Sequence, residues 1–233
     1  MSSDDQNVNL NPAEVLVTQP TAPQSELVAY EIASQANAFG LLARLWVSEI
    51  DQDLLDELLS DPVGPAYVAA GGVLPSIDSE GSDSEMSLLE NLAVEYCGCF
   101  LGPKNHLPPH QSVVAHSRFQ GDCLDSLKKY IEVIGQPKGI FSDQKMLDHA
   151  GVLFHMMQRV LASLAEAIED ESSPETTKQS LVHLRDSFYV EHLDWLIGYC
   201  NVAEGKSQSE FYSGLFRLTK SLLSEANFVG DFS

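Results

Sequence analysis

The amino-acid sequence predicts an all-α protein, folded as a single helical-bundle domain. Apolar residues recur at the spacing of helix faces through most of the chain. No run alternates between apolar and polar residues as a half-buried strand would, and no segment repeats. With 233 residues, 44% of them hydrophobic, the chain is long enough to bury a core between about eight to ten helices.

The first helices are predicted within residues 26–60. Two blocks of apolar residues at helical spacing indicate a long helix and then a short one, which Asp61-Pro62 stops. Residues 1–25 are rich in Asn, Gln, Pro, Ser and Thr and have no apolar periodicity. Such a segment cannot bury enough surface to offset the entropy of ordering, so we expect a disordered acidic or polar tail.

The middle of the chain alternates between loops and helices. Residues 71–87 are rich in Gly, Ser and acidic residues, which predicts a mobile acidic loop. Residues 85–100 have one apolar face and form a predicted helix that ends before Gly102-Pro103. A proline-rich loop then extends to residue 113.

Four further helices are predicted in the second half. Residues 123–134 form a helix that ends at Gly135, and residues 146–168 keep an i, i+3, i+4, i+7 rhythm for more than twenty residues. This longest pattern predicts the central buried helix. Two more helices fit residues 175–200 and 207–225. We therefore expect residues 26–233 to form the folded domain.

The charge of the chain is strongly negative and unevenly distributed. It has 34 acidic and 13 basic residues, a net charge of −21, and residues 1–103 hold 17 acidic residues and one Arg. Such a field favours a basic partner and repels nucleic acid and anionic membranes, although it also serves plain solubility.

No apolar run is long enough to span a membrane, and no basic residue precedes Arg44, so a cytoplasmic location is expected. The four cysteines are too few for a disulfide scaffold, and reduced thiols are expected.

Two constellations could carry function. In the first, a predicted helix ends in the aromatic-rich turn that starts at Tyr96, and two proline clusters stiffen the loop that follows. Stiff loops anchored to helices can form a groove that loses little entropy on binding, although this one could also be an ordinary helix-terminating loop.

The second candidate group is Asp148-His149, at the start of the longest helix. A helical wheel places His149 at the border of the apolar face and Asp148 well off it, in the first turns, which also fits a capping acid beside a core-edge histidine.

A metal-dependent or thiol-dependent enzyme on a helical scaffold is the alternative interpretation. Cys97 and Cys99, with His106, His110 and His116, are plausible zinc donors. However, two thiols separated by one residue on a helix end point about 200° apart, which hinders joint chelation. The chain lacks phosphate-loop, dinucleotide-binding and HExxH motifs. We expect no catalytic residues, no metal and no cofactor.

The order and spacing of these motifs resemble the TorD/DmsD/NarJ family of redox-enzyme maturation chaperones, roughly over residues 28–225. The chain departs from the family pattern at Cys99, His110 and Leu147, where that family more often has Leu, an aromatic residue and Pro. The motifs that carry the resemblance are Glu95-Tyr96, Phe100-Leu101-Gly102-Pro103, Pro108-Pro109-His110-Gln111-Ser112-Val113 and Asp148-His149.

The resemblance implies a TorD-like chaperone, monomeric or homodimeric, that catalyses nothing itself. It would bind the twin-arginine signal peptide and the apo-form of a molybdoenzyme of the DMSO-reductase family until the molybdenum cofactor is inserted, before export. Tyr96, Phe100, Pro108 and Pro109 would supply apolar lining. Asp148 and His149 would supply hydrogen bonds and, with Asp or Glu residues nearby, would meet the arginines of the client. The residues implied in client binding are Tyr96, Phe100, Leu101, Gly102, Pro103, Pro108, Pro109, Ser112, Val113, Asp148 and His149.

Overall fold

The computed structural model describes residues 24–75, 87–101, 106–117, 122–142 and 146–225. These ranges contain ten α-helices and no β-strand, which confirms the all-α prediction. None of the helices in these ranges has both the length and the apolar character that a membrane span requires. The elements are α1 (Gln24–Val47), α2 (Gln52–Leu59), α3 (Val63–Ala69), α4 (Leu88–Tyr96), a π-helical turn η1 (Cys97–Leu101), α5 (Gln111–His116), α6 (Cys123–Ile134), a 3₁₀ turn η2 (Gly139–Phe141), α7 (Ala150–Glu169), α8 (Glu175–His192), α9 (Trp195–Lys206) and α10 (Glu210–Glu225).

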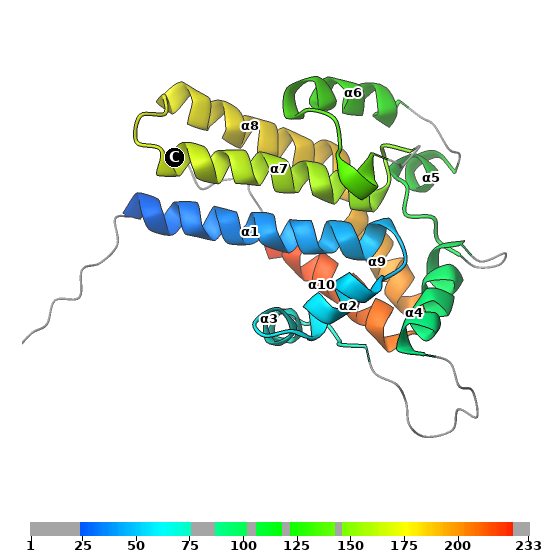
Figure 1. The fold of residues 1–233 in the computed structure, drawn as a ribbon. Coiled ribbons are helices and arrows are strands. Elements are labelled where there is room, and N and C mark those ends of the chain that lie inside the picture. The colour runs from blue at the N-terminus through cyan, green and yellow to red at the C-terminus, as the bar shows by residue number, and fades with distance from the viewer. Residues whose placement is uncertain (1–23, 76–86, 102–105, 118–121, 143–145, 226–233) are drawn as a thin grey trace, which may run out of the picture.

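Helix α7 lies at the centre of the bundle, as its sequence pattern predicts. Figure 1 shows α1 and α8 side by side with α7, while α9 and α10 cross at one end of these three. Most of the α7 side chains between residues 150 and 167 are buried. The buried apolar surface of α7 therefore joins the amino-terminal and carboxyl-terminal halves of the chain.

A cluster of aromatic rings connects α1 to four other elements. Trp46 is completely buried, and its indole Nε1 donates a hydrogen bond to Thr219 Oγ1 of α10 at 3.1 Å. Aromatic pairs at such separations add stabilisation beyond their buried area. The ring centroids within 5.5–5.9 Å of Trp46 belong to Phe100 of η1, Phe154 of α7, Tyr199 of α9 and Phe216 of α10.

The structure changes several element boundaries. Residues 175–200 form two helices rather than one, because Leu193 and Asp194 both donate their N–H groups to the carbonyl of Tyr189, at 2.9 and 3.1 Å, and α8 ends there. The short helices α3 and α5 were not predicted. Helix α1 begins at Gln24, two residues before the predicted boundary. The rest of the predicted tail and residues 76–86 of the predicted acidic loop lie outside the described residues.

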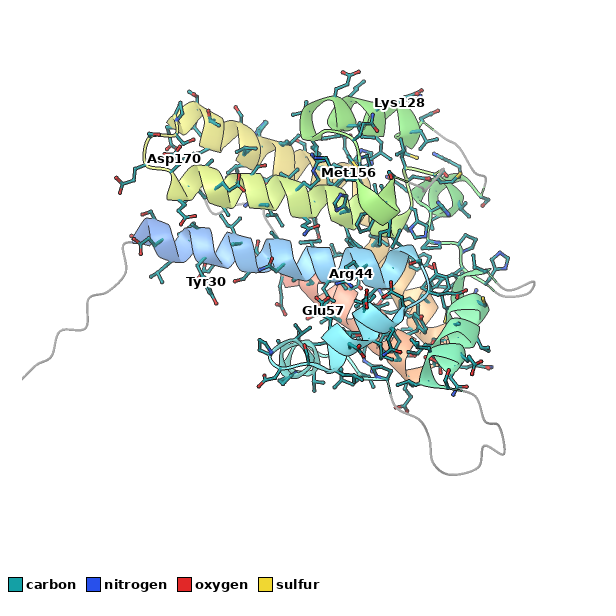
Figure 2. The ribbon with its side chains drawn as sticks, viewed as in Figure 1. Tyr30, Arg44, Glu57, Lys128, Met156 and Asp170 are labelled. Atoms are coloured by element: carbon teal, nitrogen blue, oxygen red, sulfur yellow. The ribbon has the colours of Figure 1, made fainter. Side chains whose placement is uncertain are left out.

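Arg44 pairs α1 with α2. Figure 2 shows Arg44 and Glu57 pointing toward one another, and the guanidinium forms an ion pair with the Glu57 carboxylate. The pair is partly exposed, so its contribution to stability is small. The pair matters for the charge of this region, because it engages Arg44, the single basic residue among residues 1–103.

Replacing Gly151 with alanine is expected to destabilise the protein, because the backbones of α1 and α7 approach closely at this position. An added Cβ would lie 2.8 Å from the Cα of Val47, which cannot move without displacing α1. Overpacking of this kind costs about 1–3 kcal/mol. The matched control is Gly198→Ala in α9, where a Cβ meets nothing within 4 Å and alanine should stabilise by about 0.5–1 kcal/mol. Urea unfolding of both variants measures these changes in stability. Equal midpoints for the two variants would contradict the close approach of α1 and α7 at Gly151.

Candidate functional site

The proline-rich loop is joined to the start of α7 through main-chain hydrogen bonds. The N–H of Gln111 donates to the carbonyl of Asp148 at 3.0 Å, and the N–H of Ala150 donates to the carbonyl of Pro109 at 2.8 Å. These bonds form an antiparallel bridge between His110 and His149, whose rings meet edge to face with centroids 4.9 Å apart. Two segments separated by almost forty residues in sequence are thereby held in one unit.

His149 caps α7 with its own side chain. Its Nδ1 accepts a hydrogen bond from the N–H of Gly151 at 3.1 Å, and its backbone is extended, so the helix begins only at Ala150. Burial, together with the neighbouring His110, lowers the pKa of His149 to about 3, against the opposing charge of Asp148. The ring is therefore neutral at pH 7, and because Nδ1 is an acceptor, its proton is on Nε2.

Asp148 caps a different helix, α5. Its Oδ2 accepts a hydrogen bond from the N–H of Ser112 at 2.9 Å, and its Oδ1 lies 3.4 Å from Nδ1 of His110. The side chain is fully buried. Burial raises the pKa of Asp148, but the His110 and Ser112 contacts outweigh it and lower that pKa to about 2. The carboxylate is thus charged, buried and at the positive end of α5.

The helical-wheel placement of Asp148-His149 was therefore wrong. Both residues precede α7, so wheel angles do not apply to them, and Asp148 is buried rather than well off the apolar face. The physical reason is the cap itself. Once His149 accepts the N–H of Gly151, its backbone is extended and the preceding residue turns toward the loop.

An open cavity of about 570 Å³ lies where this unit meets α1 and η1. One wall comes from the carboxyl-terminal end of α1, another from the turn after α4, and a third from the proline-rich loop and the cap of α7. Its volume suits a few side chains of a peptide or a small ligand. The lining residues are Val47, Ser48, Glu49, Tyr96, Phe100, Leu101, His106, Pro108, Pro109, His110 and His149. We call this cavity the groove.

Comparison with known proteins identifies the family. A model of the nitrate reductase delta subunit family matches residues 63–201, which is more than half of the chain. The chain belongs to the nitrate reductase delta subunit family. Members of this family are molybdoenzyme maturation chaperones rather than catalysts. Searches of curated proteins and of solved structures returned no match.

The part of the chain that matches the delta subunit family supplies two of the three groove walls. The match runs from α3 into α9, so it includes η1, the proline-rich loop and the cap of α7. It does not include the third wall, which consists of Val47 at the end of α1 and the two residues that follow the helix, Ser48 and Glu49. The family match therefore identifies the loop and the helix start, whereas the α1 wall is known from the structure alone.

The structure brings six of the eleven residues implied in client binding into the groove wall. Tyr96 and Phe100 are only 5% and 1% exposed, so most of each ring belongs to the core, whereas Leu101 is 64% exposed. Ser112 and Asp148 are buried and do not line the groove; Val113 does not line it either. Gly102 and Pro103 lie outside the described residues. The six are Tyr96, Phe100, Leu101, Pro108, Pro109 and His149.

Five other lining residues were not in the predicted set. His106 and His110 belong to the same loop and were considered as metal donors instead. No sequence pattern marked the α1 wall, which includes Glu49, as part of a binding site. An acidic residue after a long amphipathic helix is common on protein surfaces. Residues far apart in sequence, here Glu49 and His149, line one cavity only because α1 packs against α7.

The two thiols of η1 contact different residues. Cys97 Sγ lies 3.6 Å from Glu49 Oε1, whereas Cys99 Sγ lies 3.9 Å from Ser207 Oγ. Burial raises the pKa of both thiols, with an added effect of the neighbouring Glu49 on Cys97. In the part of the chain that the structure describes, no group of three or more His, Cys, Asp or Glu side chains is arranged to hold a metal ion.

Proposed function

We propose that this delta-family chaperone acts in the cytoplasm on a molybdoenzyme of the DMSO-reductase family. It binds the twin-arginine signal peptide and the apo-form of that enzyme until the molybdenum cofactor is inserted, before export. It catalyses nothing, needs no cofactor or metal of its own, and works as a monomer or homodimer without nucleic acid or stable membrane insertion.

The observation that carries this proposal is the groove, two walls of which come from the part of the chain that matches the family. Its walls combine apolar side chains, such as Leu101 and Pro109, with an exposed acid, Glu49. A basic segment followed by an apolar one is complementary to such a surface. The net charge of −21 adds long-range attraction for a basic segment.

The thiol-enzyme alternative receives no support from the described geometry. A nucleophilic cysteine needs a lowered pKa and a neighbouring base. Here the pKa values of Cys97, Cys99 and Cys200 are all raised, chiefly by burial. The thiols are therefore protonated at pH 7, and a binding function fits the groove better.

Replacing Leu101 with serine is expected to weaken client binding about tenfold with little change in stability. The side chain is 64% exposed and lines the groove, so its removal leaves no core cavity but removes apolar contact worth about 1.5 kcal/mol when buried. The probe is a synthetic peptide with two consecutive arginines followed by an apolar segment, titrated by calorimetry.

The matched control is Val133→Ser, which removes a 71% exposed apolar side chain on α6, away from the groove. This variant should bind the peptide like the wild type. Equal affinities for the Leu101→Ser variant and the wild type would place the peptide elsewhere, and no binding by the wild type would refute the proposed function.

A further inference from the structure

The charge of the groove is concentrated at the end of α1. Among the described lining residues Glu49 is the single acid, and none is Lys or Arg. Val47 and Ser48 line the groove beside it, and α1 ends at Val47. The last carbonyl groups of a helix carry the negative end of its dipole, so they add to the negative potential of Glu49.

No basic residue of the amino-terminal region neutralises this corner. Arg44 lies one turn before the end of α1, but its guanidinium pairs with Glu57 of α2 (Figure 2). Glu49 instead lies against an uncharged donor, the Cys97 thiol, with Sγ 3.6 Å from Oε1. The raised pKa of Cys97 keeps that thiol protonated, so it can hold the carboxylate in place without cancelling its charge.

Two aromatic residues line the same cavity. Tyr96 and Phe100 pack against each other, with ring centroids 4.9 Å apart, and both contribute to the groove wall. Burial, and then the charge of Glu49, raises the pKa of Tyr96. The small exposed part of these rings, 5% of Tyr96 and 1% of Phe100, adds apolar surface to this wall.

His149 offers a donor on another wall of the groove. The residue is 6% exposed and lines the groove, and its Nδ1 is occupied by the N–H of Gly151. Its Nε2–H has no partner among the described residues, and the neutral ring does not repel a cation. A carbonyl group of a bound peptide would satisfy this donor.

We infer that Glu49 and the carboxyl-terminal end of α1 form a guanidinium-binding corner of the groove, which takes one arginine of a basic client segment while His149 Nε2–H donates to the backbone of that segment. The inference rests on the proposed function, and it adds a recognition element from α1, outside the residues that match the family. Arginine suits the corner better than lysine, since its planar fork can pair with a carboxylate through two parallel hydrogen bonds.

The test compares two peptides that differ in charge alone. One has two consecutive arginines followed by an apolar segment, and the other has citrulline at both arginine positions, which keeps the shape but removes the charge. The wild type should bind the arginine peptide about tenfold or more tightly than the citrulline peptide. Glu49→Gln should reduce this preference to about twofold or less, with the affinity for the citrulline peptide unchanged.

The matched control is Glu132→Gln, which removes an exposed acid on α6 and makes the net charge less negative by the same amount. This control should keep the wild-type preference, because a general charge effect would act on both variants alike. A Glu49→Gln variant that keeps the full preference for arginine overturns the corner, whereas the groove proposal still stands if the Leu101→Ser variant is impaired. A wild-type protein that binds neither peptide overturns both.

Discussion

The Asp148→Ala variant is expected to lose about 2–4 kcal/mol of unfolding free energy. The fully buried carboxylate accepts the N–H of Ser112 and lies beside His110, so its removal leaves a buried donor unsatisfied and opens a small void. Urea unfolding measures the loss. The groove should suffer too, since the proline-rich loop and α5 are held to α7 at this point.

The same carboxylate makes stability depend on pH. The pKa of Asp148 is lowered from 3.8 to about 2 in the folded protein. The stabilisation is therefore complete above the unfolded-state value and is lost as the pH falls from about 4 to about 2, by roughly 2 kcal/mol. Asp148→Asn keeps an acceptor for Ser112 but has no charge to titrate. The difference in unfolding free energy between the wild type and this variant should therefore shrink as the pH falls from about 4 to about 2.

His149 contributes to the pH dependence at higher pH. The pKa of buried His149 is lowered from 6.5 to about 3, so stability also declines as the pH falls from 6.5 toward 3, where the unfolded chain binds a proton that the folded chain does not. Asp125→Ala serves as the control, since that carboxylate is exposed and should matter little. An Asp148→Ala variant as stable as the Asp125 control would show that the carboxylate does not cap α5.

A second large effect is expected from Phe100→Ala, which should destabilise the protein by about 3–5 kcal/mol. Phe100 is 1% exposed, and its ring centroid lies within 4.9–5.9 Å of four other aromatic rings. Truncation leaves a cavity in the cluster that joins α1, α4 and α10, while Phe100→Leu fills most of it and should cost about 1–2 kcal/mol. Chemical denaturation of both variants gives these values.

Phe100 belongs both to the core and to the groove wall, so its replacement does not test client binding by itself. The resemblance to the chaperone family implied that Phe100 lines the client site, and the ring does reach the groove wall, but most of its surface is core. Weaker peptide binding by Phe100→Ala would therefore report a damaged fold, whereas Leu101→Ala, with its 64% exposed side chain, changes the groove alone. Equal stability of these two alanine variants would contradict the core role of Phe100.

Local sequence patterns were enough to predict most of the helices. The apolar periodicity of residues 146–168 predicted the buried helix α7, and Gly135 marked the end of α6. The break between α8 and α9 was not predictable, since residues 189–195 contain no glycine or proline. It arises where the carbonyl of Tyr189 accepts two N–H groups and where Trp195 Nε1 donates to the carbonyl of His192 at 2.8 Å.

By itself, the sequence determined the all-α class, the order of the main helices and the motifs that later proved to flank one groove. Only the tertiary structure decided what those motifs do. Asp148 caps α5, and His149 caps α7. Glu49, which follows α1, contacts Cys97 and lines the groove. The reason is physical. Helical periodicity is a local property that three or four neighbouring residues encode, whereas capping across segments and the closure of a groove depend on contacts between residues that are distant in sequence.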